Sequence, residues 1–223
     1  FLNQMGAQIK VYGQKCIIVN GVNTLKGINH KVMPDNMEGL TWLIASALTN
    51  SEIAIYDFPI KDLEVPLIFL KSSGLRFEEN DGYIKVKKNQ SIYPIDISTG
   101  PYPGINSDMQ PLFATFAAMA QGQSKIIDLR FPGRYQYAEE LKKMGLNYNI
   151  KDQMLIINGG NQLKGCKVKA TDLRGGIALL IAGMCAKNTT TISNAWQILR
   201  GYNEIEEKLN SMGANVSFIN EGI

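Results

Sequence analysis

The sequence predicts an α/β fold made of about three copies of one unit, in which a helix, a strand, a second helix and two more strands follow one another. Two landmarks that recur along the 223 residues carry this prediction. One is a glycine that ends a helix-like stretch, and the other is an aspartate that precedes an almost wholly apolar stretch. A landmark that returns at a fixed period indicates a repeated structural unit.

The glycine landmark occurs four times, about 70 residues apart, in segments that resemble one another. The segments read FLNQMGAQIK, IFLKSSGLRF, ELKKMGLNYN and KLNSMGANVS, and their glycines are Gly6, Gly74, Gly145 and Gly213. Each glycine follows amphipathic helical spacing and precedes alternating apolar residues. This pattern is typical of a helix that stops at a C-terminal glycine and is followed by a strand.

The aspartate landmark opens three segments, MPDNMEGLTWLIASAL, NSDMQPLFATFAAMA and ATDLRGGIALLIAGM. In each segment about twelve apolar residues with helical spacing follow the aspartate, which is Asp35, Asp108 or Asp172. An aspartate before a helix commonly caps it by accepting backbone N–H groups. The pattern therefore predicts three buried helices, each beginning at an aspartate.

The segments between the landmarks predict the remaining elements. The strands are expected in SEIAIYDF, SKIIDLRF and TTTISNAW, which are rich in β-branched and apolar residues. Each leads to a second, more polar helix, such as the one expected in RYQYAEELKKMG. After the glycines, YIKVKK and MLIING predict hairpin strands, because alternating apolar residues are bounded there by Gly and Asn.

These elements divide the chain into two parts. Residues 1–30 supply the end of a preceding repeat or domain, and residues 31–223 form one domain with repeats at 31–100, 101–170 and 171–223. Solenoid units are usually about 20 to 50 residues long, so we expect a closed, pseudo-threefold domain with the apolar helices inside and the sheets outside. The incomplete first copy leads us to expect a piece of a longer protein.

The composition argues against several classes of protein. A chain that is 45% hydrophobic buries a sizeable core. The 23 basic and 20 acidic residues give a net charge of +3, which is too small and too evenly spread to indicate a nucleic acid partner. The longest apolar run, residues 175–186, is well short of the roughly 20 residues that cross a bilayer, so no membrane association is predicted.

The three cysteines, Cys16, Cys166 and Cys185, are widely spaced and predict neither a disulfide framework nor a zinc site. Free thiols favour a reducing compartment, which here is the cytoplasm. His30, the only histidine, is expected to be a structural loop residue.

Three helices that pack side by side present their N-termini near one another, and helix N-termini favour anions. The candidate functional residues lie on this surface or on the loops beside it: Ser107, Asp108, Arg134, Asp172, Arg174 and Arg200. The arginines could clamp a small polyanion, and a carboxylate among them could take a proton from a substrate hydroxyl. Alternatively, the aspartates are only caps and the arginines only solvated surface charges.

Four short motifs occur in the order VMPDNME, YPGINSDMQP, ATDLRGG and ILRGY. They resemble the C-terminal half of the UDP-N-acetylglucosamine enolpyruvyl transferases, and the resemblance covers nearly the whole chain. It implies an inside-out α/β barrel, an active site facing a missing N-terminal domain, and phosphoenolpyruvate and a UDP-amino sugar as substrates. It implies no metal and no cofactor. The shikimate 3-phosphate enolpyruvyl transferases are more distant relatives with the same fold.

The resemblance also implies roles for single residues. Asp108 matches the aspartate that takes the proton of the sugar hydroxyl, and Arg174 and Arg200 match arginines that hold phosphoenolpyruvate. The substrate-binding residues that it implies are Ser107, Arg130, Phe131, Arg134 and Asp172.

The chain departs from the family pattern around the acceptor site that the resemblance implies. The segment PGRYQY replaces a usual Glu-Asn-Arg-Phe-Met-His, which puts Pro132, Gly133 and Tyr137 in a substrate-facing loop. Arg130 stands where an aliphatic residue normally contacts the amino sugar, and Asn36 replaces a usual arginine. The resemblance therefore predicts retained phosphoenolpyruvate chemistry with altered recognition of the acceptor.

Three hypotheses about function remain open. In the first, the chain is part of an enzyme that moves the enolpyruvyl group of phosphoenolpyruvate to the 3-hydroxyl of UDP-N-acetylglucosamine, for peptidoglycan synthesis, and is inactive by itself. In the second, the acceptor is a nucleotide or shikimate 3-phosphate. In the third, the chain is a half-length, non-catalytic protein that binds a sugar nucleotide or a partner chain.

Overall fold

A computed structural model describes residues 1–13, 15–88 and 91–219, and the chain divides into two units, Phe1–Met33 and Pro34–Ile223. The first unit holds one antiparallel strand pair, β1 (Gln8–Tyr12) and β2 (Cys16–Asn20). Turns precede β1, and Gly6 lies among them with a φ of 102°. The predicted change from glycine to strand is present here, although residues 2–6 form turns and not a helix.

Three apolar helices form the inside of the second unit, as predicted. They are α1 (Asn36–Leu48), α3 (Gln110–Met119) and α5 (Leu173–Cys185). Each of the three contacts the other two, and their inward side chains, such as Leu40, Phe113 and Leu179, are fully buried. Removal of this much apolar surface from water is the main stabilising contribution to the unit.

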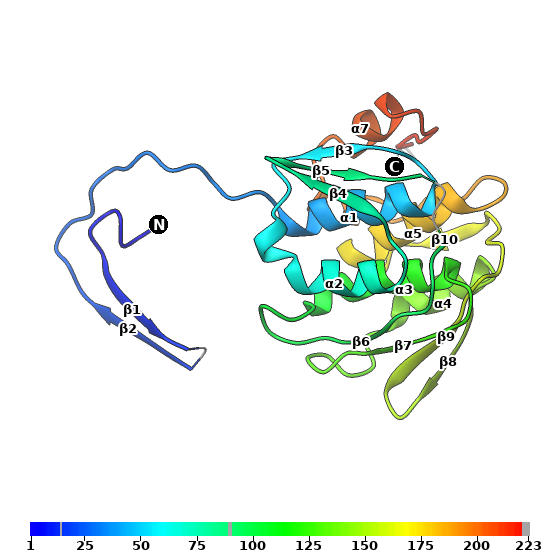
Figure 1. Cartoon of the computed structure of the whole chain (residues 1–223), viewed down its shortest axis with the longest axis horizontal. Helices are drawn as coiled ribbons and strands as arrows, with labels where there is room; N and C mark the ends of the chain where they lie inside the picture. Colours follow the sequence, from blue (N-terminus) through cyan, green and yellow to red (C-terminus); the bar gives the residue numbers. More distant parts are fainter. Residues whose placement is uncertain (14, 89–90, 220–223) are drawn as a thin grey trace. The chain divides into compact units, whose positions relative to one another are not determined.

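Two sheets lie on either side of these helices (Figure 1). The first is antiparallel throughout and has the order β3-β5-β4, formed by β3 (Ala54–Tyr56), β4 (Phe77–Asn80) and β5 (Tyr83–Val86). The second has the order β6-β7-β9-β8, formed by β6 (Asp96–Ser98), β7 (Gln123–Ile127), β8 (Asn147–Lys151) and β9 (Met154–Asn158). In this sheet β6 is parallel to β7, and the other pairs are antiparallel.

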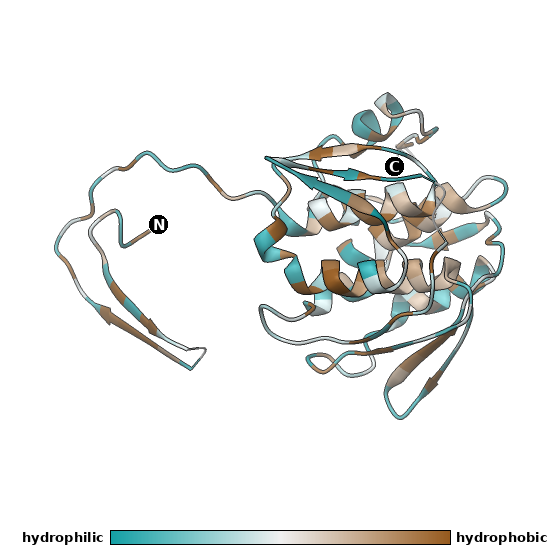
Figure 2. Ribbon diagram, in the orientation of Figure 1, coloured by the Kyte–Doolittle hydropathy of each residue, from teal (hydrophilic) through white to brown (hydrophobic). Residues whose placement is uncertain are grey.

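The strands differ in hydropathy according to their place in the sheets. Figure 2 shows that β9 is mostly hydrophobic, whereas β4 is mostly hydrophilic. Within β9, Leu155 and Ile157 are fully buried and alternate with partly exposed residues. Such alternation is expected of a strand with one face on the core. A separate parallel pair, β10 (Lys167–Lys169) and β11 (Thr191–Ser193), accompanies α5.

The more polar helices end where the glycines predict. They are α2 (Glu64–Ser72), α4 (Gln136–Lys143) and α7 (Ile205–Ser211). Gly74, Gly145 and Gly213 follow them with φ values of 89°, 105° and 92°. At Gly74 a Cβ atom would also lie 2.2 Å from the carbonyl oxygen of Ser91, so no other residue fits this turn.

The order of elements confirms the predicted α/β class. The sequence α1-β3-α2-β4-β5 is followed by β6 and then by α3-β7-α4-β8-β9. The last unit runs α5-β11-α6-α7, with α6 at Trp196–Leu199, and no strand follows α7 before residue 220. Glu204, with a φ of 52°, separates α6 from α7, so the single second helix that the pattern predicts is divided in two.

Across the described ranges, the structure contains no helix with both the length and the apolar character needed to cross a membrane.

Candidate active site

The first turns of α1 and α5 are capped by aspartates, as predicted. Asp35 accepts hydrogen bonds from the N–H groups of Met37 and Glu38, at 2.7 and 3.2 Å. Asp172 accepts the corresponding bonds from Arg174 and Gly175, at 2.8 and 2.9 Å. These carboxylates satisfy N–H groups that have no partner inside the helix.

Asp108 does not cap its helix, so the prediction of a third aspartate cap is wrong. The short 3-10 helix η2 (Ser107–Met109) precedes α3, and Asn106 caps it by accepting the N–H of Asp108 at 2.9 Å. Asn106 has an extended backbone, which is typical of a capping residue. The start of α3 has no side-chain cap, so the carboxylate of Asp108 is available for other partners.

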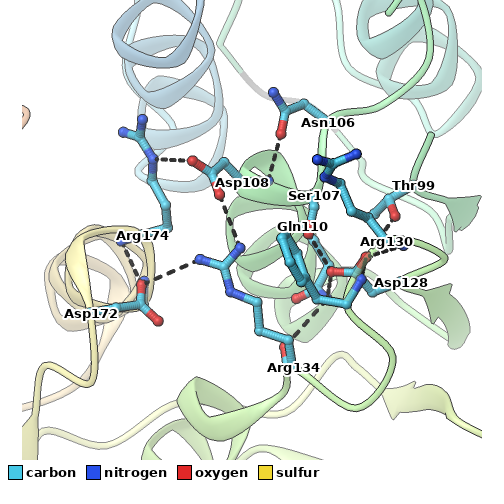
Figure 3. A network of polar contacts seen from close by, with 12 residues as sticks. Thr99, Asn106, Ser107, Asp108, Gln110, Asp128, Arg130, Arg134, Asp172 and Arg174 are labelled. Atoms are coloured by element: carbon cyan, nitrogen blue, oxygen red, sulfur yellow. Dashed lines mark hydrogen bonds and ion pairs between the residues drawn. The ribbon is translucent and has the colours of Figure 1, made fainter. Parts of the chain in front are cut away.

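Those partners are two arginines from other parts of the chain (Figure 3). Nη1 of Arg134 lies 2.9 Å from Oδ1 of Asp108, and Nε of Arg174 lies 3.3 Å from Oδ2. Nη2 of Arg134 also lies 3.9 Å from Oδ1 of Asp172. Four of the predicted site residues therefore form one cluster of two carboxylates and two guanidinium groups. We call Asp108, Arg134, Asp172 and Arg174 the charged cluster.

The arginines set the protonation of Asp108. Partial burial raises the pKa of this carboxyl, but hydrogen bonds and charge from Arg134 and Arg174 outweigh burial and lower the pKa below its ordinary value. Asp108 is therefore ionised at neutral pH and paired with both cations.

Tyr202 connects the charged cluster to α1. It is 2% exposed, and its hydroxyl lies 2.8 Å from Oγ1 of Thr41, on the second turn of α1. The same hydroxyl interacts with Arg174, and burial raises its pKa. Tyr202 belongs to the motif ILRGY, whose pattern predicted no role for it.

Arg200 lies apart from the charged cluster. Its guanidinium is exposed and donates a hydrogen bond to Oε1 of Gln197 at 2.8 Å. No bond to Asp108, Asp172 or Arg174 is found for it in the part of the chain that the structure describes. Its predicted role in holding substrate stays a prediction.

Ser107 and the loop that carries Arg134 meet at a buried carboxylate that the sequence analysis missed. Asp128 follows β7 and is 1% exposed. It accepts the hydroxyl hydrogen bond of Ser107, and the N–H groups of Arg130 and Phe131, each at 3.0 Å. Ser107 is buried too, with its hydroxyl directed at Asp128 rather than at solvent. An acidic residue within the apolar predicted strand segment SKIIDLRF was the available signal.

The loop after Asp128 presents an aromatic ring between two cations. Phe131 is 49% exposed, and the guanidinium carbons of Arg130 and Arg134 lie 5.6 and 5.7 Å from its ring centre. This distance suits a cation–π contact. Tyr137, in contrast, is buried in the first turn of α4, so the prediction that it faces substrate is wrong.

The arrangement suits an anionic substrate that reacts with a hydroxyl. Guanidinium groups bind phosphate and carboxylate in bidentate fashion, and an ionised carboxylate beside them can accept a proton. Within residues 1–13, 15–88 and 91–219, no three His, Cys, Asp or Glu side chains come together in a way that could hold a metal ion. His30 lies in the first unit, where its ring contacts Phe1 at 4.8 Å between centres.

The family model described as EPSP synthase (3-phosphoshikimate 1-carboxyvinyltransferase) matches residues 1–209. UDP-N-acetylglucosamine 1-carboxyvinyltransferase 1 of Caldanaerobacter subterraneus subsp. tengcongensis is 38% identical over 97% of this chain and 52% of its own. UDP-N-acetylglucosamine 1-carboxyvinyltransferase 2 of Clostridium tetani is also 38% identical, over 97% and 52%. The chain thus spans about half the length of the relatives it matches.

Solved structures are also similar to this chain. The enolpyruvyl transferase NikO from Streptomyces tendae has a TM-score of 0.85 and 26% identity, covering 96% of this chain and 51% of its own. EPSP synthase from Acinetobacter baumannii has a TM-score of 0.73 and 20% identity, covering 97% and 54%. At that identity the second likeness shows the fold alone.

Proposed function

Because this chain belongs to the EPSP synthase family, we propose that it is part of an enzyme that transfers the enolpyruvyl group of phosphoenolpyruvate to the 3-hydroxyl of UDP-N-acetylglucosamine. The names of the relatives at 38% identity support this acceptor. The observation that carries the proposal is the charged cluster, in which a carboxylate is held between two arginines at the meeting point of η2, α5 and the loop before α4.

In this proposal Arg134 and Arg174 bind the phosphate and carboxylate of phosphoenolpyruvate, and Asp108 acts as the base. The acceptor hydroxyl gives its proton to Asp108 while its oxygen bonds to C2 of phosphoenolpyruvate and C3 takes a proton from a general acid of the complete protein. Phosphate then leaves C2 as C3 returns a proton to a base, which restores the double bond. Negative charge shifts between these groups during the reaction, and the fixed guanidinium groups of Arg134 and Arg174 lower the free energy of the transition state.

The ion pairs of Asp108 give the site a way to prepare its base. An anion that binds Arg134 and Arg174 competes with Asp108 for the same N–H donors. When the donors move to the substrate, the interactions that lower the pKa of Asp108 weaken and the pKa rises. A carboxylate with a higher pKa is the stronger base, so binding of the anion promotes proton transfer.

Further parts of the proposal concern the whole protein. The second unit forms an inside-out α/β barrel of three pseudo-threefold repeats, and an N-terminal domain supplies the other wall of the site. Asp172 holds substrate beside Arg174, and Arg130, Phe131 and Arg200 complete the substrate contacts. The protein works in the cytoplasm on a peptidoglycan precursor, needs neither metal nor cofactor, and binds neither nucleic acid nor membrane.

Phosphate release tests the proposal. The complete protein is given phosphoenolpyruvate with UDP-N-acetylglucosamine, shikimate 3-phosphate or a uridine nucleotide in parallel reactions. We expect release with the amino sugar, and a loss of about 100-fold or more in Asp108→Asn, since general-base catalysis contributes about 100- to 10,000-fold. Asp96→Asn is the matched control, because Asp96 is an exposed acceptor for the N–H of Lys125 on the neighbouring strand. Equal rates for Asp108→Asn and the unsubstituted protein would rule out Asp108 as the base.

A different acceptor is the second candidate function, favoured by the loop of Arg130 and Phe131. An exposed ring flanked by two guanidinium groups suits a planar ring with attached phosphate, such as a nucleotide. Release of phosphate only with the uridine nucleotide or with shikimate 3-phosphate would support it. Binding of a sugar nucleotide without release from any acceptor would instead support a non-catalytic protein.

A further inference from the structure

We propose that Asp128 is a positioning residue that holds Asp108 and Arg134 in the geometry needed for proton transfer. This inference rests on the proposed function, because positioning has meaning only for a reaction at Asp108. Asp128 itself does not face the charged cluster, and its role is exerted through the segments bound to it (Figure 3).

The carboxylate of Asp128 is saturated with donors. Oδ1 accepts the hydroxyl of Thr99 at 2.8 Å and the N–H groups of Arg130 and Phe131. Oδ2 accepts the hydroxyl of Ser107 and, at 3.2 Å, Nε2 of Gln110. A carboxylate offers about four acceptor positions, so these donors occupy all of them.

All of these donors are uncharged groups. A buried carboxylate is costly unless hydrogen bonds replace the lost water, and here neutral dipoles do so. Burial raises the pKa of Asp128, but the hydrogen bonds from Ser107, from the loop N–H groups and from Thr99 outweigh burial. The pKa is therefore below its ordinary value, and the group stays ionised. With 1% exposure and every acceptor position in use, Asp128 cannot itself be the base for a substrate hydroxyl.

The donors come from the two segments that carry the Asp108–Arg134 ion pair. Ser107 directly precedes Asp108, so its bond to Asp128 fixes the start of η2. The N–H groups of Arg130 and Phe131 begin the loop that leads to Arg134, and the N–H of Arg134 in turn donates to the Phe131 carbonyl at 3.1 Å. Movement of Asp128 would therefore shift both partners of the pair.

Gln110 adds a second link between these segments. Its Nε2 donates to Oδ2 of Asp128 and lies 3.4 Å from the Arg134 carbonyl oxygen. Its Oε1 is buried without a hydrogen-bond partner in the described part of the chain. The orientation of the amide is therefore set by its two acceptors, Asp128 and the Arg134 carbonyl. It leaves Oε1 buried without a donor, which costs folding free energy, and a need to hold Asp128 and Arg134 together would explain that cost.

Asp128→Asn in the complete protein tests the inference. The amide has the same shape, but one oxygen becomes an NH2 group that can no longer accept the hydrogen bonds made there, so bonds to at least one segment are broken or reversed. We expect kcat for phosphate release to fall about 10- to 100-fold, because small displacements of catalytic groups have effects of that size. KM for phosphoenolpyruvate should change less than kcat. The acidic limb of the kcat/KM profile, which reports the free protein, should move to higher pH, since a displaced Arg134 no longer lowers the pKa of Asp108.

Ser124→Ala is the matched control for loss of stability. Ser124 lies on β7, four residues before Asp128, is fully buried, and accepts the N–H of Ile95 at 3.0 Å. Its removal weakens the same strand without touching the charged cluster. Equal changes in kcat and in the pH profile for both variants, or no change in Asp128→Asn, would overturn the inference.

A titration separates this inference from the proposed function. If the complete protein releases no phosphate with any acceptor, the proposed function fails. The carboxyl of Asp108 can still be titrated by carbon-13 NMR, assigned with Asp108→Asn, in the unsubstituted protein and in Asp128→Asn. A higher pKa of Asp108 in Asp128→Asn supports positioning, and an unchanged pKa refutes it. If Asp128→Asn does not fold, Ser107→Ala removes one donor alone and should shift the pKa of Asp108 in the same direction by less.

Discussion

Asp172 caps α5 and also lies beside Arg134, and a set of substitutions can separate the two roles. Asp172→Ala removes both the cap and the carboxylate, whereas Asp172→Asn keeps an oxygen that can accept the N–H groups of Arg174 and Gly175. Asparagine caps helices about as well as aspartate. Asp35→Ala, at the matching position of α1, removes a cap that has no contact with the charged cluster among its described bonds.

The magnitudes follow from the contacts. Loss of a cap costs about 1 kcal/mol, within a range of about 0.5 to 2 kcal/mol. The 3.9 Å pair of Asp172 with Arg134 is partly exposed, so it adds only about 0 to 1 kcal/mol. We expect Asp172→Ala to lose about 1 to 2 kcal/mol of unfolding free energy, Asp35→Ala about 1 kcal/mol, and Asp172→Asn less than about 1 kcal/mol.

Urea unfolding and phosphate release by the complete protein distinguish the roles. If Asp172 contacts substrate, Asp172→Asn should lose activity while it keeps its stability, and Asp35→Ala should lose stability while it keeps its activity. Full activity in Asp172→Asn would refute the reasoning and leave Asp172 as a cap only.

Three other predictions concern the charged cluster and the core. Because the pKa of Asp108 is lowered on folding, its ion pairs stabilise the protein above the ordinary pKa of 3.8, and this stability is lost as pH falls through the lower folded value. When unfolding free energy is measured against pH, Asp108→Asn should therefore lose less stability in acid than the unsubstituted protein. An equal loss would contradict the assignment. Tyr202→Phe removes the 2.8 Å bond to Thr41 and should cost about 1 kcal/mol in urea unfolding, whereas an unaltered midpoint would show that the bond contributes nothing. Gly159→Ala would place Cβ 2.1 Å from the Ala117 carbonyl oxygen, so thermal unfolding should show a loss of about 3 kcal/mol or more, and a near-normal melting temperature would mean that the backbone there yields easily.

Periodicity was sufficient to predict the inner helices and the turns that end the outer ones. The apolar runs after Asp35 and Asp172 identify α1 and α5 together with their caps, because helical spacing and capping are local properties. The prediction failed at Asp108 for an equally local reason. Asn106, two residues earlier, caps the short helix η2 that contains Asp108, and the sequence alone does not show at which of two such close capping residues the helical segment begins.

The candidate site was only partly predictable, since several of its contacts join residues far apart in the chain. Asp128 acts through Thr99 and Ser107, which lie 29 and 21 residues away. Tyr202 meets Thr41 across 161 residues. No period or spacing rule indicates such pairs, whereas the arginines of the charged cluster were found because their residue type signals anion binding.

The same separations affect how the protein folds. The charged cluster joins Asp108 to Arg174 across 66 residues, and Tyr202 bonds to Thr41 on α1 across 161 residues. Contacts between distant residues require large loops to close, which slows folding. During synthesis the charged cluster cannot be complete until α5 has left the ribosome. We therefore expect a nascent chain that ends before α5 to pair Asp108 with Arg134 alone, and the complete cluster to appear in one late step rather than repeat by repeat.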